Sequence, residues 1–188
     1  YSSENPMVAA LRGEKPVIKI LNKADLADPE LTQAWMDYLE QQDGVKAIAC
    51  DTEKANDVKR IIAICKHLVP NKVGTGRQIK AMIMGIPNVG KSTLINTLAG
   101  RAVAKTGDEP AVTKSQQLIK LDDDIMLYDT PGMLWPKVEN ENSGYRLAAT
   151  GGIRDTAFDF ADVASYTAEY LMQAYPELLK TRYKIEEL

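Results

Sequence analysis

Short apolar runs and helically spaced apolar faces alternate along the first half of the chain. Runs at residues 16–21, 45–50 and 79–84 predict short buried strands. The pair Asp28-Pro29 predicts a helix start, with Asp28 as the N-terminal cap. Apolar residues then recur at helical spacing on two segments: Leu31, Ala34, Trp35, Tyr38 and Leu39 on the first, and Val58, Ile61, Ile62, Cys65 and Leu68 on the second. Strands that alternate with helices predict an α/β domain with a mainly parallel sheet.

The pattern in the second half of the chain changes near Tyr145. Before it, residues 91–99 predict a helix that ends near Gly100, and residues 116–121 and 125–128 predict two strands joined by an acidic turn. After it, the strand signal disappears. A helical tail is predicted by the spacing of Val163, Tyr166, Tyr170, Leu171 and Ala174.

The composition is that of an ordinary folded domain rather than of a membrane protein or a basic nucleic-acid binder. The 188 residues are 45% hydrophobic and 26% charged, with a net charge of −3 at pH 7. No apolar run approaches the ~20 residues of a membrane span, and no signal peptide is visible. Cys50 and Cys65 lack a CxxC spacing, which favours a reduced, cytosolic setting. Because the chain opens at Tyr1 without methionine, we expect residues to be missing upstream.

Residues 85–92 (GIPNVGKS) match the phosphate-loop pattern G-x-x-x-x-G-K-[ST] between a predicted strand and a predicted helix. Backbone N–H groups and the helix N-terminus hold phosphate oxygens in such a loop, and Lys91 places its charge on the β- and γ-phosphates. Ser92 offers a hydroxyl to Mg²⁺. A chance corner with a solvated lysine is the alternative, which the strand–loop–helix context disfavours. The predicted nucleotide-binding residues here are Asn88, Val89, Gly90, Lys91, Ser92 and Thr93.

Residues 22–25 (NKAD) fit a guanine-reading motif, although a polar loop after a strand explains a lone match as well. Asp25 can accept hydrogen bonds from the guanine N1–H and 2-amino groups, a donor pair that adenine lacks. Asn22 can hold the loop, and the stem of Lys23 can lie over the base. The motif precedes the phosphate loop, whereas in ordinary GTPases it comes last. This order predicts a P-loop GTPase fold with circularly permuted motifs (G4-G5-G1-G2-G3).

Residues 129–132 (DTPG) fit the DxxG switch, although the same residues form an ordinary turn. Asp129 can reach Mg²⁺ through water, and the Gly132 N–H can donate to the γ-phosphate, so that loss of this phosphate releases the loop. Thr113, in the polar stretch 106–117, is the candidate switch threonine for Mg²⁺ and the γ-phosphate. A surface threonine is the alternative.

A base-bracing element is expected after the strand at residues 45–50. Asp51 and Thr52 occupy that place and are predicted to bind the nucleotide. They depart from the Ser-Ala that is usual in GTPases, and a solvated turn fits them equally well.

These motifs, in this order, resemble the circularly permuted GTPases, and within them the ribosome biogenesis GTPase A (RbgA/YlqF) family with its mitochondrial relatives. The resemblance covers nearly the whole chain and is carried by SSENP, NKAD, GIPNVGKSTLIN, AKTGDEP, SQQ, DTPGMLWPK and RLAATG. It implies a cytoplasmic or mitochondrial-matrix factor that binds GTP with Mg²⁺ and acts in late assembly of the large ribosomal subunit. Neither a membrane nor DNA is an expected partner.

The family pattern divides the chain into a G domain (residues 1–140) and a helical segment (residues 141–188) that begins an RNA-contacting domain. Family members usually start earlier, with a histidine-bearing segment and a strand that ends near Asp-Ala-Arg. Neither is present here, and the G domain would lack a sheet strand if this were the whole protein, so we expect a fragment or an incompletely ordered start. Ala111 replaces the glycine that is common after Pro110, which stiffens the switch loop.

The mechanism requires a substitute for the water-orienting glutamine, because Met133 stands directly after DxxG. In related GTPases an asparagine at the position of Asn88 helps to hold K⁺ against the phosphates, and the same role is a hypothesis here. An asparagine that tolerates an unusual backbone conformation is the alternative. The predicted catalytic residues are Lys91, Thr113 and Asn88, with slow intrinsic hydrolysis that a partner and K⁺ stimulate.

Three functions are considered for these motifs. The first is a GTP-hydrolysing assembly switch, which Lys91, Ser92, Thr113 and Asp129 favour. The second is a GTP-dependent binding module with negligible intrinsic hydrolysis, which the missing glutamine favours. An ATP-using phosphotransferase is disfavoured by Asp25.

Overall fold

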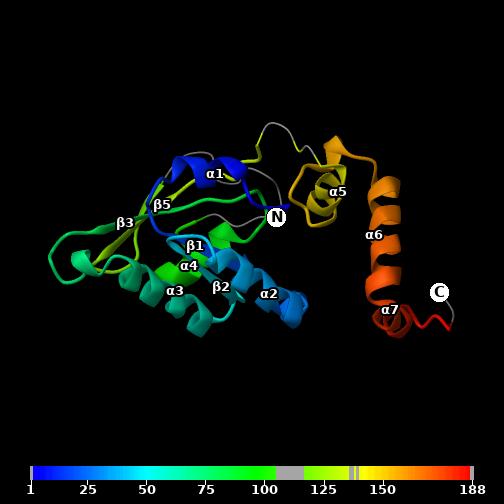
Figure 1. Ribbon diagram of the computed structural model, residues 1–188, viewed down its shortest axis with the longest axis horizontal. Helices are drawn as coiled ribbons and strands as arrows, with labels where there is room; N and C mark the ends of the chain where they lie inside the picture. Colours follow the sequence, from blue (N-terminus) through cyan, green and yellow to red (C-terminus); the bar gives the residue numbers. More distant parts are fainter. Residues whose placement is uncertain (1, 105–116, 136–137, 139, 187–188) are drawn as a thin grey trace. The chain divides into compact units, whose positions relative to one another are not determined.

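The computed structural model describes residues 2–104, 117–135, 138 and 140–186 (Figure 1). The chain divides into two compact units, one of residues 5–133 and one of residues 1–4 with 134–188. The expected assignment of residues 1–140 to a G domain and of residues 141–188 to the start of an RNA-contacting domain stays a prediction.

The strands of the larger unit form two sheets. In the first, β1 (Val17–Asn22) pairs in parallel with β2 (Val45–Cys50). In the second, β3 (Ile79–Ile83) pairs in parallel with β5 (Ile125–Asp129), and β4 (Gln117–Lys120) pairs with β5 in antiparallel fashion. Within the described ranges no strand pair joins the two sheets. The predicted α/β fold with mainly parallel pairing is confirmed, with the strands divided between two sheets.

Helices connect and flank these strands. They are α1 (Pro6–Leu11), the 3-10 turn η1 (Ala24–Leu26), α2 (Pro29–Glu40), α3 (Ala55–Leu68), the 3-10 turn η2 (Pro70–Lys72) and α4 (Lys91–Ala99). The predicted cap of α2 is confirmed, because the Asp28 carboxylate accepts a hydrogen bond from the Glu30 N–H at 2.9 Å. The unpredicted α1 begins in the same way, with the Asn5 side chain accepting from the Met7 N–H at 2.9 Å and Pro6 in the first turn.

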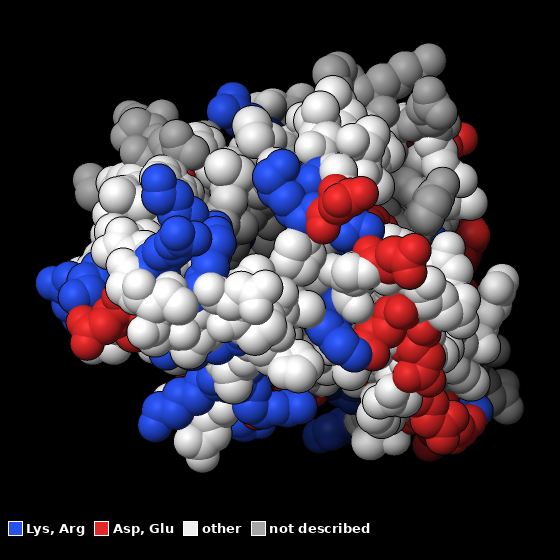
Figure 2. Space-filling view, turned by 60° about the vertical axis from the view of Figure 1, so that its left-hand side comes forward, with Lys and Arg blue, Asp and Glu red and all other residues white. Residues whose placement is uncertain are grey.

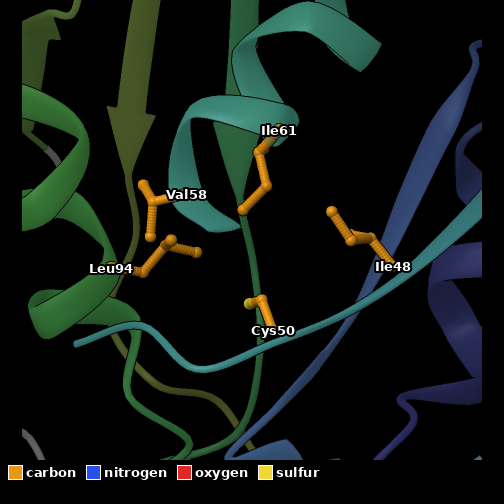
Figure 3. Close-up of a cluster of buried hydrophobic side chains, with 5 residues drawn as sticks. All are labelled: Ile48, Cys50, Val58, Ile61 and Leu94. Atoms are coloured by element: carbon orange, nitrogen blue, oxygen red, sulfur yellow. The ribbon is translucent and has the colours of Figure 1, made fainter. Parts of the chain in front are cut away.

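One buried cluster fastens the first sheet to the helix of the phosphate loop (Figure 3). Ile48 and Cys50 of β2 lie among Val58 and Ile61 of α3 and Leu94 of α4. All five side chains are buried, so this cluster helps to join the two halves of the larger unit, one with β1, β2 and α3 and the other with β3, β4, β5 and α4.

A second cluster holds α4 on the other sheet. Ile95 of α4 packs with Ile119 of β4, Leu127 of β5 and Ala104. Leu94 belongs to the first cluster and Ile95 to the second, so consecutive residues of α4 pack against the two sheets. The position of α4 is therefore fixed from two sides.

The apolar face predicted for α2 is only partly buried. Leu39 is buried, whereas Leu31, Trp35 and Tyr38 are exposed, and the two aromatic rings contact each other edge to face at 5.6 Å. Helical spacing alone does not reveal how much of a face a sheet of two strands can cover.

A charged link also joins the two halves. The Lys66 ammonium of α3 lies 2.7 Å from an Asp122 carboxylate oxygen and 3.2 Å from one of Asp124, in the turn between β4 and β5. Asp122 also accepts from the N–H groups of Asp124 and Ile125, at 2.9 and 2.7 Å. Burial opposes ionisation of Asp122, but these donors together hold its pKa below the ordinary value of 3.8.

We expect Asp122→Asn to remove the charge of this link while keeping the oxygen that caps the turn. A carboxyl group with a lowered folded-state pKa stabilises the fold fully above its unfolded pKa, and this contribution is lost as the pH falls below 3.8. The pair is partly exposed, so the free energy of unfolding should fall by only about 1 kcal/mol at pH 7. Urea unfolding at pH 7 and below pH 3.8 measures this difference, which should shrink in acid. Asp123→Asn is the matched control, since the ion pair of Asp123 within the described residues is with the exposed Lys120.

The smaller unit is helical, as predicted. It contains α5 (Glu141–Ala149), the 3-10 turn η3 (Asp155–Ala157), α6 (Phe160–Ala174) and α7 (Pro176–Tyr183). Stacked rings of Tyr145 and Tyr166, 4.9 Å apart, fasten α5 to α6. Among the described helices of both units, none is long and apolar enough to cross a membrane.

Candidate functional site

The parallel strand pairs bring the four described motifs together two by two. Asn22 and Cys50 are register partners at the carboxyl ends of β1 and β2, so residues 22–25 lie beside Asp51 and Thr52. Ile83 and Asp129 are partners at the carboxyl ends of β3 and β5, so the phosphate loop lies beside DTPG. Ligands of α/β proteins bind at this end of the strands.

The phosphate loop has the backbone that its sequence predicts. It begins at Gly85, shortly after β3 ends at Ile83, and enters α4 at Lys91, and Gly90 caps the helix in the left-handed region with φ +89°. Asn88 is also left-handed, with φ +59°. Such a conformation turns successive N–H groups toward one point and forms a concave site for an anion. The positive φ of Asn88 also supports the alternative explanation for this residue, that asparagine stands here because it tolerates an unusual backbone conformation.

The Lys91 ammonium lies across the loop. It donates to the carbonyl oxygens of Gly85 at 3.0 Å and Ile86 at 2.5 Å. Burial lowers the pKa of Lys91, while the nearby Asp129 carboxylate opposes this shift. A half-buried cation at the start of a helix provides charge for a phosphate.

The residues of NKAD reach the phosphate loop directly. The Asn22 amide donates to the Val89 carbonyl at 2.9 Å, and its buried carbonyl oxygen has no hydrogen-bond partner among the described residues. At Gly90, a side chain would collide with the Asn22 amide, so glycine is required there for contact as well as for conformation. Lys23 is left-handed, with φ +56°, and turns the chain into η1, which carries Asp25.

DTPG is fastened to the same loop. Asp129 is buried at the end of β5, and the Thr130 hydroxyl donates to the Ile83 carbonyl at 2.7 Å. The Met133 N–H donates to the Gly85 carbonyl at 3.2 Å. A side chain at Gly132 would lie 2.9 Å from the Pro87 nitrogen, so glycine allows DTPG to approach the loop.

Asp51 and Thr52 form a hydrogen-bonded turn in which Thr52 is buried and Asp51 is partly exposed. The Asp51 carboxylate accepts from the Glu53 N–H at 3.0 Å, and this bond lowers the pKa of Asp51. Thr52 is buried, and its carbonyl accepts from the Thr97 hydroxyl of α4 at 2.9 Å.

One pocket of about 210 Å³ lies between these loops. It is lined by Asn22, Lys23, Asp25, Leu26, Asp51, Thr52, Glu53, Gly90 and Thr93. Sequence reasoning selected all of these except Leu26 and Glu53, which directly follow selected residues and could have been included on that ground. The lining of this pocket extends from the residues of NKAD to Gly90 and Thr93 at the start of α4.

The remaining predicted residues lie around the phosphate loop or outside the described ranges. Ser92 lies in the first turn of α4, and Gly132 borders Lys91. Thr113 falls outside the described residues. A hydroxyl and a buried carboxylate are oxygen donors of the kind that Mg²⁺ prefers, so Ser92 and Asp129 fit a magnesium ion bound with phosphates.

Comparison with known proteins agrees with this geometry. Residues 80–181 match the family of 50S ribosome-binding GTPases. The chain is 49% identical to Ribosome biogenesis GTPase A of Priestia megaterium over all of this chain and 67% of that protein. It is 33% identical to Mitochondrial ribosome-associated GTPase 1 of Xenopus tropicalis over 97% of this chain and 61% of that protein.

The fold is similar to that of a solved relative. A GDP-bound structure of YlqF from T. maritima superimposes with a TM-score of 0.63 and 24% identity, covering 96% of this chain and 72% of that one. The chain therefore belongs to the family of 50S ribosome-binding GTPases.

Proposed function

We propose that this chain binds GTP through its permuted motifs, hydrolyses it, and acts as an assembly factor for the large ribosomal subunit. The observation that carries the proposal is the 2.9 Å hydrogen bond from Asn22 to Val89, which joins the guanine-reading motif to the phosphate loop across one pocket. Binding of fluorescent GTP and GDP, competed by unlabelled GTP but not by ATP, tests the nucleotide part. Equal competition by ATP would refute it.

The pocket, the phosphate loop and the DTPG segment have separate tasks in this proposal. Asp25 accepts from the guanine edge, and the turn of Asp51 and Thr52 braces the base from the second strand. The phosphate-loop N–H groups and Lys91 hold the β- and γ-phosphates. Ser92, Asp129 and Thr113 hold Mg²⁺, which neutralises charge that develops on the phosphates.

Hydrolysis in this proposal is slow without a partner. Met133 stands where a glutamine orients water in small GTPases, its N–H donates to Gly85, and its side chain is 48% exposed. We propose that a K⁺ ion held with the help of Asn88 supplies positive charge at the phosphates. The support is the position of Asn88 inside the loop and the apolar residue after DxxG.

Single-turnover GTP hydrolysis is therefore expected to be faster in KCl than in NaCl at matched ionic strength, by about tenfold if the ion contributes about 1.4 kcal/mol to the barrier. Adding large ribosomal subunits should accelerate it further. Phosphate release after mixing enzyme in excess over GTP measures both effects. Equal rates in the two salts would remove the role of K⁺.

A second function, a GTP-dependent binding module with negligible hydrolysis, is favoured by Met133. The same experiment separates the two functions. A rate that stays at the level of free GTP with K⁺ and ribosomal subunits present would establish the binding module.

The ribosomal partner requires local rather than bulk charge. The net charge is −3, and Figure 2 shows several groups of basic side chains on the face that it presents, some of them bordered by acidic side chains. We propose that such basic clusters contact rRNA, that residues 141–188 begin an RNA-contacting domain, and that the protein works in the cytoplasm or mitochondrial matrix. We also propose a nucleotide-dependent docking step in late maturation of the large subunit.

A further inference from the structure

Thr97 of α4 connects the two sides of the nucleotide pocket without lining it. Its hydroxyl oxygen lies 2.9 Å from the Thr52 carbonyl and 3.0 Å from the Thr93 carbonyl one turn back. Thr52 and Thr93 both line the pocket, one on the base side and one at the phosphate helix. The hydroxyl has one hydrogen to share between these two acceptors.

The turn of Asp51 and Thr52 makes other hydrogen bonds as well. They stabilise the turn itself but do not attach it to α4. The Asp51 carboxylate accepts from the Glu53 N–H at 3.0 Å, and the backbone carbonyl of Asp51 accepts from the Lys54 N–H at 3.0 Å. The Asp51 N–H reaches Asp57 of α3 at 3.4 Å. These contacts lie within the half that carries β2 and α3, whereas the bond from Thr97 crosses to the other half.

The hydrogen bond from Thr97 to Thr52 is important because the two sheets share no strand pair within the described ranges. The two sides of the pocket are held together by packing of Leu94 and by side-chain bonds such as that of Asn22. The hydrogen bond from Thr97 to Thr52 limits how far the turn of Asp51 and Thr52 can move away from α4. Thr52 is only 5% exposed, so its carbonyl has little access to water as a substitute.

We propose that Thr97 is a positioning residue that holds the turn of Asp51 and Thr52 on the phosphate helix and thereby slows release of guanine nucleotide. The inference rests on the proposed guanine-nucleotide function and assigns the retention of the base to a residue that does not touch it. Loss of the hydroxyl should weaken contacts with the base and leave contacts with the phosphates in place.

Thr97→Val removes the hydroxyl and keeps the volume of the side chain. We expect mant-GDP to dissociate about fivefold faster from this variant, since one buried hydrogen bond changes an equilibrium by about this factor. Competition by tripolyphosphate, which has no base, should stay within about twofold of wild type. Thr167→Val is the matched control, because Thr167 makes the same bond one turn back, to Val163 at 2.7 Å, in α6 of the other unit.

Thr97→Ser and Thr97→Ala are a second pair of variants, and they differ from each other only in the hydroxyl. They test the same role if valine at position 97 distorts the helix. The serine should release mant-GDP at nearly the wild-type rate and the alanine about fivefold faster. Equal release from serine and alanine, or a loss of tripolyphosphate binding as large as the loss of GDP binding, would overturn the inference. If the wild-type chain itself did not retain mant-GDP, the proposed nucleotide function would fail first.

Discussion

Asp25→Asn is expected to lose affinity for GTP by about 10²- to 10⁴-fold and to bind xanthosine triphosphate more tightly than GTP. The carboxylate of Asp25 accepts from two donors on guanine, each bond to a charged group being worth about 1.5–3 kcal/mol. An amide offers one acceptor and one donor, which fits the N1–H and 2-oxo groups of xanthine. Titration of the variant with both nucleotides measures the exchange of preference.

Glu53→Gln is the control for this substitution. Glu53 lines the same pocket from the other loop, and the change from carboxylate to amide is chemically identical. We expect it to change GTP affinity by less than about threefold and to give no preference for xanthosine nucleotides. If Asp25→Asn kept the wild-type preference, the guanine-reading role of residues 22–25 would be wrong.

Gly132→Ala is expected to slow GTP hydrolysis at least about tenfold while leaving GDP affinity within about twofold. A methyl group there would lie 2.9 Å from the Pro87 nitrogen, 3.0 Å from the Pro87 Cα and 3.2 Å from the Lys91 ammonium. DTPG would therefore have to move away from the phosphate loop, and the Gly132 N–H with it. The base side of the pocket is built from other loops and should not change.

Single-turnover hydrolysis and GDP titration of this variant measure the two effects separately. Gly144→Ala is the control, because a methyl group at Gly144 of α5 meets no atom within 4 Å. Unchanged hydrolysis by Gly132→Ala would show that the approach of DTPG to the phosphate loop is not needed for the reaction.

Local elements of this fold follow closely from local sequence. The apolar run at residues 45–50 is β2, and the segment at residues 91–99, which the sequence closes near Gly100, is α4. A strand that delivers a phosphate loop needs only a short apolar run and a glycine, both visible in the sequence. Helix α1 was missed although Asn5-Pro6 carries the same start signal as Asp28-Pro29, because only six residues follow the cap.

Contacts between distant residues do not follow from such patterns. Nothing near Thr97 indicates that its hydroxyl meets Thr52, 45 positions earlier, and the acidic turn gives no sign that Lys66 binds it. The separation into two sheets depends on which strands find partners, which no single segment determines. The candidate site was largely predictable because its motifs carry their chemistry in short segments, whereas the links that hold the pocket together come from tertiary packing.

We propose that a guanine nucleotide bound between the permuted motifs controls docking on the large ribosomal subunit. Co-sedimentation of this chain with purified large and small subunits, in GTP, a non-hydrolysable GTP analogue, GDP or no nucleotide, tests it most directly. We predict binding to the large subunit with GTP or the analogue, and at least about tenfold weaker binding with GDP or without nucleotide. Equal sedimentation in all four conditions, or binding to the small subunit alone, would contradict the account.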